Sequence, residues 1–96
     1  MGTSMELQLR LFATFREIVG GKEHTLTVDE GASVGDVLAT LEAEYDELEE
    51  RLLEDGTLRP QLSVLKNGRD VIHQEGAATP LEDGDTLSVF PPVAGG

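Results

Sequence analysis

Only one segment of this 96-residue chain carries the apolar spacing of a long helix, and this limits the folds open to it. Ser33 begins the segment, and Asp36 follows in the pattern of a capping box, in which each side chain satisfies a free backbone N–H of the first turn. Apolar residues then recur at intervals of three and four: Val34, Val37, Leu38, Leu41, Tyr45 and Leu48. A single helix with one apolar stripe predicts a two-layer fold, with the helix on one face of a sheet.

The opposite face of this helical segment is acidic. Six carboxylates lie there, and we expect them to be solvated: Glu42, Glu44, Asp46, Glu47, Glu49 and Glu50. A kink or a second short helix is expected near Asp46. The helical region is expected to end at residues 54–56, because Gly56 takes the left-handed cap conformation at little cost.

Two strands are expected ahead of the helix. Residues 5–12 alternate, with three leucines on one face and polar side chains on the other, which is the period of a half-buried strand. A connection over residues 15–21 follows, and a second strand is predicted at residues 23–28. Because the connection ends in a glycine pair suited to a turn, the two strands are expected to be antiparallel.

The clearest hairpin signal is Asn67-Gly68. This pair fits a two-residue turn that needs positive φ, and it lies between predicted strands at residues 62–65 and 70–72. Residues 74–85 are predicted to form a loop with turns, because they are rich in glycine, proline and aspartate.

The last strand is predicted at residues 86–90, and it ends at Pro91, which has no N–H to donate to a ladder. The resulting order is strand–strand–helix–strand–strand–strand. The simplest fold with this order is the β-grasp, or ubiquitin-like, fold of the α+β class. Its mixed sheet would have four to five strands, with the one main helix packed on one face and the last strand lying centrally beside the first.

The length and composition predict one domain with a modest core of leucine and valine. We assign the β-grasp domain to residues 5–92. Residues 1–4 precede a second methionine and are interpreted as an expression remnant or a disordered N-terminus, and residues 93–96 as a flexible tail that ends in Gly-Gly.

The charge balance restricts the partners of the chain. Nineteen acidic residues stand against seven basic ones, a formal net charge of −12, and this surface repels phosphate backbones and anionic lipids. Nucleic-acid and membrane-surface roles are therefore not expected. No cysteine is present, and no apolar run approaches the ~18 residues of a membrane span, so we expect a cytoplasmic protein. High acidity with few lysines is also typical of a halophilic protein. Salt would screen the repulsion among its acidic side chains.

The end of the sequence, FPPVAGG, is unusual because its glycine pair has no following segment to turn. Pro91 and Pro92 would stiffen the exit from the last strand and reduce the entropy lost on docking. Gly95 and Gly96 have no Cβ, so such a tail can thread a narrow channel and leave its carbonyl open to attack. These features predict that the carboxylate of Gly96 is a reactive group.

The segments LKNGRDV and TPLEDGDTLSVFPPVAGG resemble the ubiquitin-like sulfur carriers of the MoaD/ThiS group. They resemble still more closely the small archaeal modifier proteins, and the likeness runs from Met5 to Gly96. It implies that a ubiquitin-activating-type enzyme adenylates the Gly96 carboxylate with ATP. The acyl group would then pass to a lysine of a target protein as an isopeptide.

The same resemblance implies a second fate, in which the terminus becomes a thiocarboxylate for molybdopterin synthesis or tRNA thiolation. In the first of these the chain would be the small subunit of a molybdopterin synthase, inserted into the large subunit. A plain binding module with an idle tail is the third alternative. In no case do we expect catalytic residues, a metal or a bound cofactor of the chain's own, and a monomer is expected.

Further residues are candidates for contacts. Partner docking is expected near the tail, at Leu65, Phe90, Pro91, Pro92 and Val93. Lys22 and Lys66, the two lysines, are possible acceptors of a modifier, and Arg10 and Arg69 are possible partners for acidic groups. His24 and His73 have no clustered ligands, Asp83 and Asp85 are interpreted as turn residues, and Ser33 as a helix cap.

Overall fold

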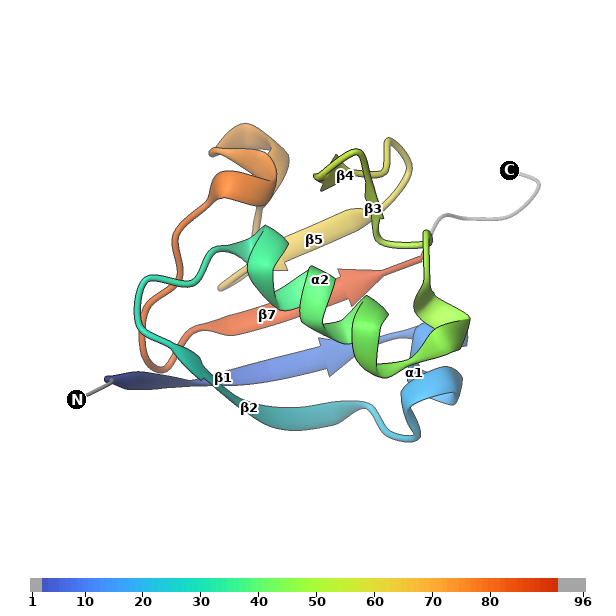
Figure 1. Cartoon of the computed structure of the whole chain (residues 1–96), viewed down its shortest axis with the longest axis horizontal. Helices are drawn as coiled ribbons and strands as arrows, with labels where there is room; N and C mark the ends of the chain where they lie inside the picture. The colour runs from blue at the N-terminus through green and yellow to red at the C-terminus, as the bar shows by residue number, and fades with distance from the viewer. Residues whose placement is uncertain (1–2, 92–96) are drawn as a thin grey trace.

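The computed structural model describes residues 3–91. They form a mixed sheet with the main helix across one face (Figure 1). The elements of the first half are β1 (Ser4–Leu11), α1 (Ala13–Val19), β2 (Glu23–Asp29), α2 (Val34–Glu44) and the 3-10 helix η1 (Asp46–Leu48). Those of the second half are β3 (Leu53–Glu54), β4 (Thr57–Leu58), β5 (Ser63–Lys66), β6 (Arg69–Asp70), the 3-10 helices η2 (Val71–His73) and η3 (Gly76–Ala78), and β7 (Thr86–Phe90).

The main sheet has five strands in the order β2-β1-β7-β5-β6. β1 and β7 are parallel, with Leu9 opposite Leu87, and the other neighbours are antiparallel. The predicted β-grasp fold is therefore confirmed, including the central place of the last strand beside the first. β3 and β4 form a separate two-stranded hairpin.

The core lies between this sheet and α2. The alternation of β1 places Met5 and the three leucines on the helix side, each at most 5% exposed. The buried face of α2 consists of Val34, Val37, Leu38 and Leu41. The predicted capping box is present: the Asp36 N–H donates to Ser33 Oγ at 3.3 Å, and the Ser33 N–H donates to Asp36 Oδ2 at 2.9 Å.

The region after α2 confirms one prediction and corrects two. η1 is the expected short helix near Asp46. The predicted end of the helical region at Gly56 is wrong, because Asp55 and Gly56 form the turn between β3 and β4, with φ of 53° and 80°. Glu42 is not simply solvated, since its Oε2 accepts the backbone N–H groups of Leu52 and Leu53 at 3.1 and 3.0 Å.

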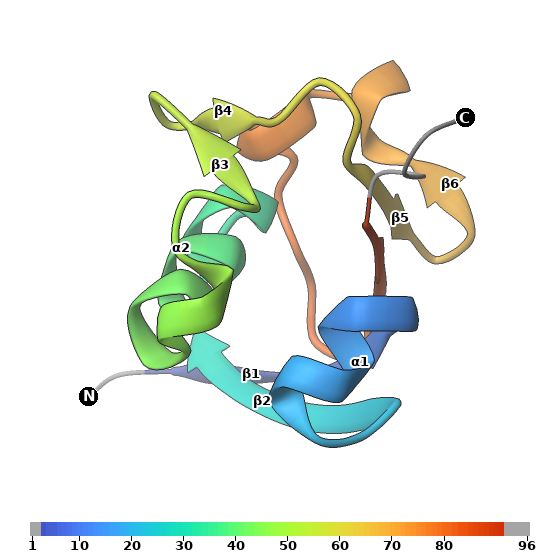
Figure 2. The same cartoon turned by 90° about the vertical axis from the view of Figure 1, so that its right-hand side faces the viewer.

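The segment before β2 was predicted to be a connection, and this is also wrong, because residues 13–19 form α1. The helix buries Phe15 in the core and ends at Gly20, whose φ is 90° and whose N–H donates to the carbonyl of Arg16 at 2.9 Å. A helix this short has little intrinsic stability, and its sequence carries no clear helix pattern. The burial of Phe15 in the core therefore stabilises it. α1 lies beside the end of β7 (Figure 2).

The predicted turn at Asn67 and Gly68 is confirmed. The two residues have φ of 51° and 85° and join β5 to β6. β6 is shorter than expected, because the chain turns into η2 at Val71, which is buried. The predicted loop at residues 74–85 contains one turn of 3-10 helix, η3. No helix in residues 3–91 is long and apolar enough to cross a membrane.

Candidate functional site

The candidate site is the surface around the end of β7, from which the tail continues. Leu87 and Val89 are buried on the helix side of the sheet, which fixes the strand in the core. Phe90 and Pro91 follow, both half-buried, and Pro91 is the last residue described. The predicted reactive and docking residues of the tail, Pro92, Val93, Gly95 and Gly96, lie outside the described residues.

An aromatic pair forms the base of the tail. The rings of Phe12 and Phe90 are stacked, with centroids 4.2 Å apart and planes inclined by 11°. The pair arises from the parallel register of β1 and β7. Because Leu11 lies opposite Val89, the residues that follow them, Phe12 and Phe90, also lie side by side. Stacked aromatic pairs contribute about 0.5–1.5 kcal/mol beyond the area they bury.

Two cations lie over the Phe12 ring of this pair. The Arg10 guanidinium carbon is 5.8 Å from the centroid of the Phe12 ring, and Lys22 Nζ is 5.6 Å from the same centroid. Both distances are within the range of cation–π attraction. Arg10 Nε is shielded from solvent and has no hydrogen-bond partner in residues 3–91.

Leu65 shares the outer face of the sheet with this group. Ser88 of β7 lies between Arg10 on β1 and Leu65 on β5, and the three form one row across the strands. The exposed fraction of Ser88 is only 9%, because its neighbours cover it. The structure therefore brings two predicted docking residues, Leu65 and Phe90, onto one surface with Arg10.

The two candidate acceptor lysines differ in their surroundings. Lys22 is exposed. Lys66 Nζ donates to the carbonyl of Pro80 at 2.8 Å and lies 3.7 Å from Asp85 Oδ2. Asp85 also accepts from Asn67 Nδ2 at 2.9 Å and from a backbone N–H, so Lys66 belongs to a network that anchors the start of β7.

The remaining polar candidates have local structural contacts. Asp83 Oδ1 accepts the N–H of Glu6 at 2.7 Å in the turn at Gly84, where φ is 88°. His24 Nε2 lies 3.1 Å from the carbonyl oxygen of Gly21. Within residues 3–91, no group of three or more histidine, aspartate or glutamate side chains could hold a metal ion.

Sequence reasoning missed Phe12 as part of this site. The alternation of β1 places it on the outer face, because it follows the inward-facing Leu11. Its contact with Phe90 depends on the register between β1 and β7, which strand periodicity alone does not give. Arg10 was predicted as a partner for acidic groups, and its position over Phe12 was not.

Comparison with known proteins gives consistent results. The sequence model of the ThiS family matches residues 9–96. The chain is 64% identical over 92 residues to small archaeal modifier protein 3 of Haloferax volcanii, a match that covers 96% of this chain and 100% of that protein. The solution structure of the Haloferax volcanii HVO 2177 protein superposes with a TM-score of 0.91 at 63% identity and covers 97% of this chain and 88% of that one. The sulfur carrier protein CysO of Mycobacterium tuberculosis is 38% identical over 69 residues, which are 69% of this chain and 74% of CysO.

Proposed function

The chain belongs to the ThiS family, and from this premise we propose that it is a ubiquitin-like protein modifier attached to other proteins through Gly96. The observation that carries the proposal is the match to a small archaeal modifier protein at 64% identity over that protein's whole length. The fold supports it, since β7 is a rigid central strand that leads directly into the tail.

The proposed chemistry begins with the Gly96 carboxylate, which is a poor electrophile. In the site of an activating-type enzyme, a carboxylate oxygen attacks the α-phosphorus of ATP and pyrophosphate leaves. A lysine amine of a target protein then attacks the carbonyl carbon, AMP leaves, and the amine loses a proton as the isopeptide forms. ATP is the substrate of the partner enzyme, and this chain supplies the acyl group and no catalytic side chain.

The residues at the base of the tail would guide docking. The enclosed site must exclude water, because the acyl-adenylate would otherwise hydrolyse. The Phe12–Phe90 pair and Leu65 offer apolar surface for this enclosure. Arg10 and Lys22 favour an enzyme surface that places carboxylates beside the aromatic pair.

A sulfur-carrier role is the second candidate, favoured by the likeness to CysO. A persulfide of a partner protein would attack the acyl-adenylate and release AMP. A thiol would then cleave the sulfur–sulfur bond, leaving a thiocarboxylate on Gly96 and a disulfide on the partner. Because this chain has no cysteine, the persulfide and the thiol would both belong to partner proteins. The thiocarboxylate would then deliver its sulfur to molybdopterin synthesis or to tRNA thiolation.

The test uses cells of the source organism that express a tagged copy with or without Gly95 and Gly96. A ladder that survives reductant on a denaturing gel and disappears in the truncation supports the modifier. A single band whose intact mass shows sulfur in place of oxygen at the terminus supports the carrier. If neither signal is observed, both proposals are refuted and a plain binding module remains. The truncation should melt at the same temperature as the full chain, since a terminal pair contributes little packing.

A further inference from the structure

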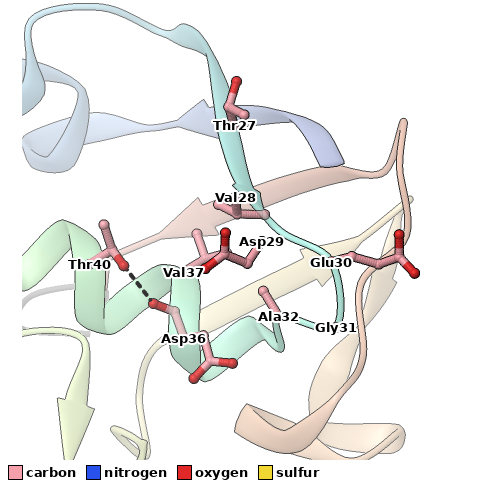
Figure 3. A pocket seen from close by; sticks show the side chains of 9 residues that line it. All are labelled: Thr27, Val28, Asp29, Glu30, Gly31, Ala32, Asp36, Val37 and Thr40. Atoms are coloured by element: carbon pink, nitrogen blue, oxygen red, sulfur yellow. Dashed lines mark hydrogen bonds between the residues drawn. The ribbon is translucent and has the colours of Figure 1, made fainter. Parts of the chain in front are cut away.

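A cavity of about 440 Å³ opens between the second half of β2 and the first turns of α2 (Figure 3). Its apolar part consists of Val28, Ala32 and Val37. The residues that line it come from the strand, the loop and the helix: Thr27, Val28, Asp29, Glu30, Gly31, Ala32, Asp36, Val37 and Thr40.

The strand beside this cavity has an open edge. β2 is one of the two edge strands of the sheet and pairs only with β1. At the two ends of the pairing, the Leu11 N–H donates to the carbonyl of Lys22 and the Glu30 N–H donates to the carbonyl of Thr3. Because the register between them is unbroken, the backbone groups of the even-numbered residues of β2 bond to β1. The N–H and C=O groups of Thr25 and Thr27 therefore point outward, and no strand of residues 3–91 pairs with them.

The charges at this edge define what can occupy it. Asp29, Glu30 and Asp36 line the cavity, and no lysine or arginine does. Asp36 is engaged in the helix cap, whereas the side chains of Asp29 and Glu30 make no hydrogen bond or ion pair within the described chain. An open strand edge beside an apolar pocket with an acidic rim suits an extended segment that carries basic residues.

We propose that this groove, formed by the β2 edge and the cavity beside it, binds an extended basic segment of another protein. The segment adds a strand to β2 by bonding to the backbone of Thr25 and Thr27. Alternate small apolar side chains enter the cavity, and lysine or arginine meets Asp29 and Glu30. A second copy of this chain is a poor occupant, because it would bring its own net charge of −12 to an acidic edge.

The groove and the end of β7 lie at opposite ends of the sheet. β2 is antiparallel to β1, so Asp29 lies beside Ser4 at the start of β1. β7 is parallel to β1, and Val89 lies opposite Leu11, so Phe90 lies just past the end of β1. A protein held in the groove would therefore leave the base of the tail accessible. The inference does not depend on the proposed chemistry of Gly96.

The test is an NMR titration of the full ¹⁵N-labelled chain at low ionic strength with the capped peptide Lys-Val-Thr-Val-Thr-Val-Lys. The control peptide has glutamate in place of both lysines. We expect shifts at residues 25–30 with the basic peptide alone, and slower hydrogen exchange at the amides of Thr25 and Thr27. No shifts, equal binding of both peptides, shifts at other strands, or self-association through β2 would each overturn the proposal.

Two variants of equal charge provide the matched comparison. Asp29→Asn with Glu30→Gln should weaken binding of the basic peptide about threefold to tenfold, since exposed ion pairs contribute little each. Glu17→Gln with Glu47→Gln changes the net charge equally at exposed sites outside the cavity, and should leave the affinity within about twofold. Equal weakening in both would show a general charge effect and contradict the groove.

Discussion

The Glu42→Ala variant tests how one side chain of the acidic helix face stabilises the chain that follows it. Glu42 Oε2 accepts the N–H groups of Leu52 and Leu53 at 3.1 and 3.0 Å, and Leu52 is 1% exposed. Hydrogen bonds to a charged group contribute about 1.5–3 kcal/mol each, and partial exposure of Glu42 reduces this. We therefore expect a loss of about 2–3 kcal/mol in the free energy of unfolding, most of it from two donors left without an acceptor.

The measurement is urea unfolding followed by circular dichroism. With a slope of about 1.5 kcal/mol per molar urea, the midpoint should fall by roughly 1.3–2 M. Glu44→Ala is the matched control: it lies on the same helix, is exposed and makes no side-chain hydrogen bond in residues 3–91, so its change should stay within about 0.5 kcal/mol. Glu42→Gln keeps an acceptor oxygen and should fall between the two. Equal midpoints for the two alanine variants would refute the argument.

The other predictions concern the tail, the lysines and the charge. In a double-mutant cycle of Phe12→Leu and Phe90→Leu, urea unfolding should give a coupling of about 0.5–1.5 kcal/mol, whereas additive losses would contradict the stacking. Acetylation followed by peptide mass spectrometry should modify Lys22 before Lys66, whose amine is bonded, and equal rates would argue against that bond. Gly95→Val should slow ATP–pyrophosphate exchange by the activating enzyme about tenfold, because a β-branched side chain obstructs a narrow channel, and an unchanged rate would dismiss the channel. The free energy of unfolding should rise with salt as repulsion among the carboxylates is screened, and a flat response would count against it.

The parts of the fold that follow from local chemistry were predictable. The Ser33–Asp36 capping box satisfies free backbone N–H groups within four residues of the chain. The Asn67-Gly68 pair accepts the positive φ that its turn needs. The central place of β7 followed from the order of the elements. The reactive role of the tail stays a prediction, because its residues lie outside those that the structure describes.

The parts that were missed depend on contacts between distant segments. α1 is a helix because Phe15 reaches the core, and the sequence of residues 13–19 has no capping pattern to show it. Gly56 has the positive φ expected of a cap, but the same φ serves a hairpin turn, and only the pairing of β3 with β4 distinguishes the two. The Phe12–Phe90 pair depends in the same way on a strand register.

The central position of β7 has a mechanical consequence for anything joined to the tail. A force applied through the tail would act along β7, which is bonded to β1 on one side and to β5 on the other. Hydrogen bonds loaded along the strand direction are sheared together, whereas those loaded across the strands break one at a time. Forced unfolding is governed by the unfolding rate, so the fold should yield slowly to traction from this end. A protein machine that pulls on such a conjugate would therefore have to break the hydrogen bonds on both sides of β7 before it unravelled this chain.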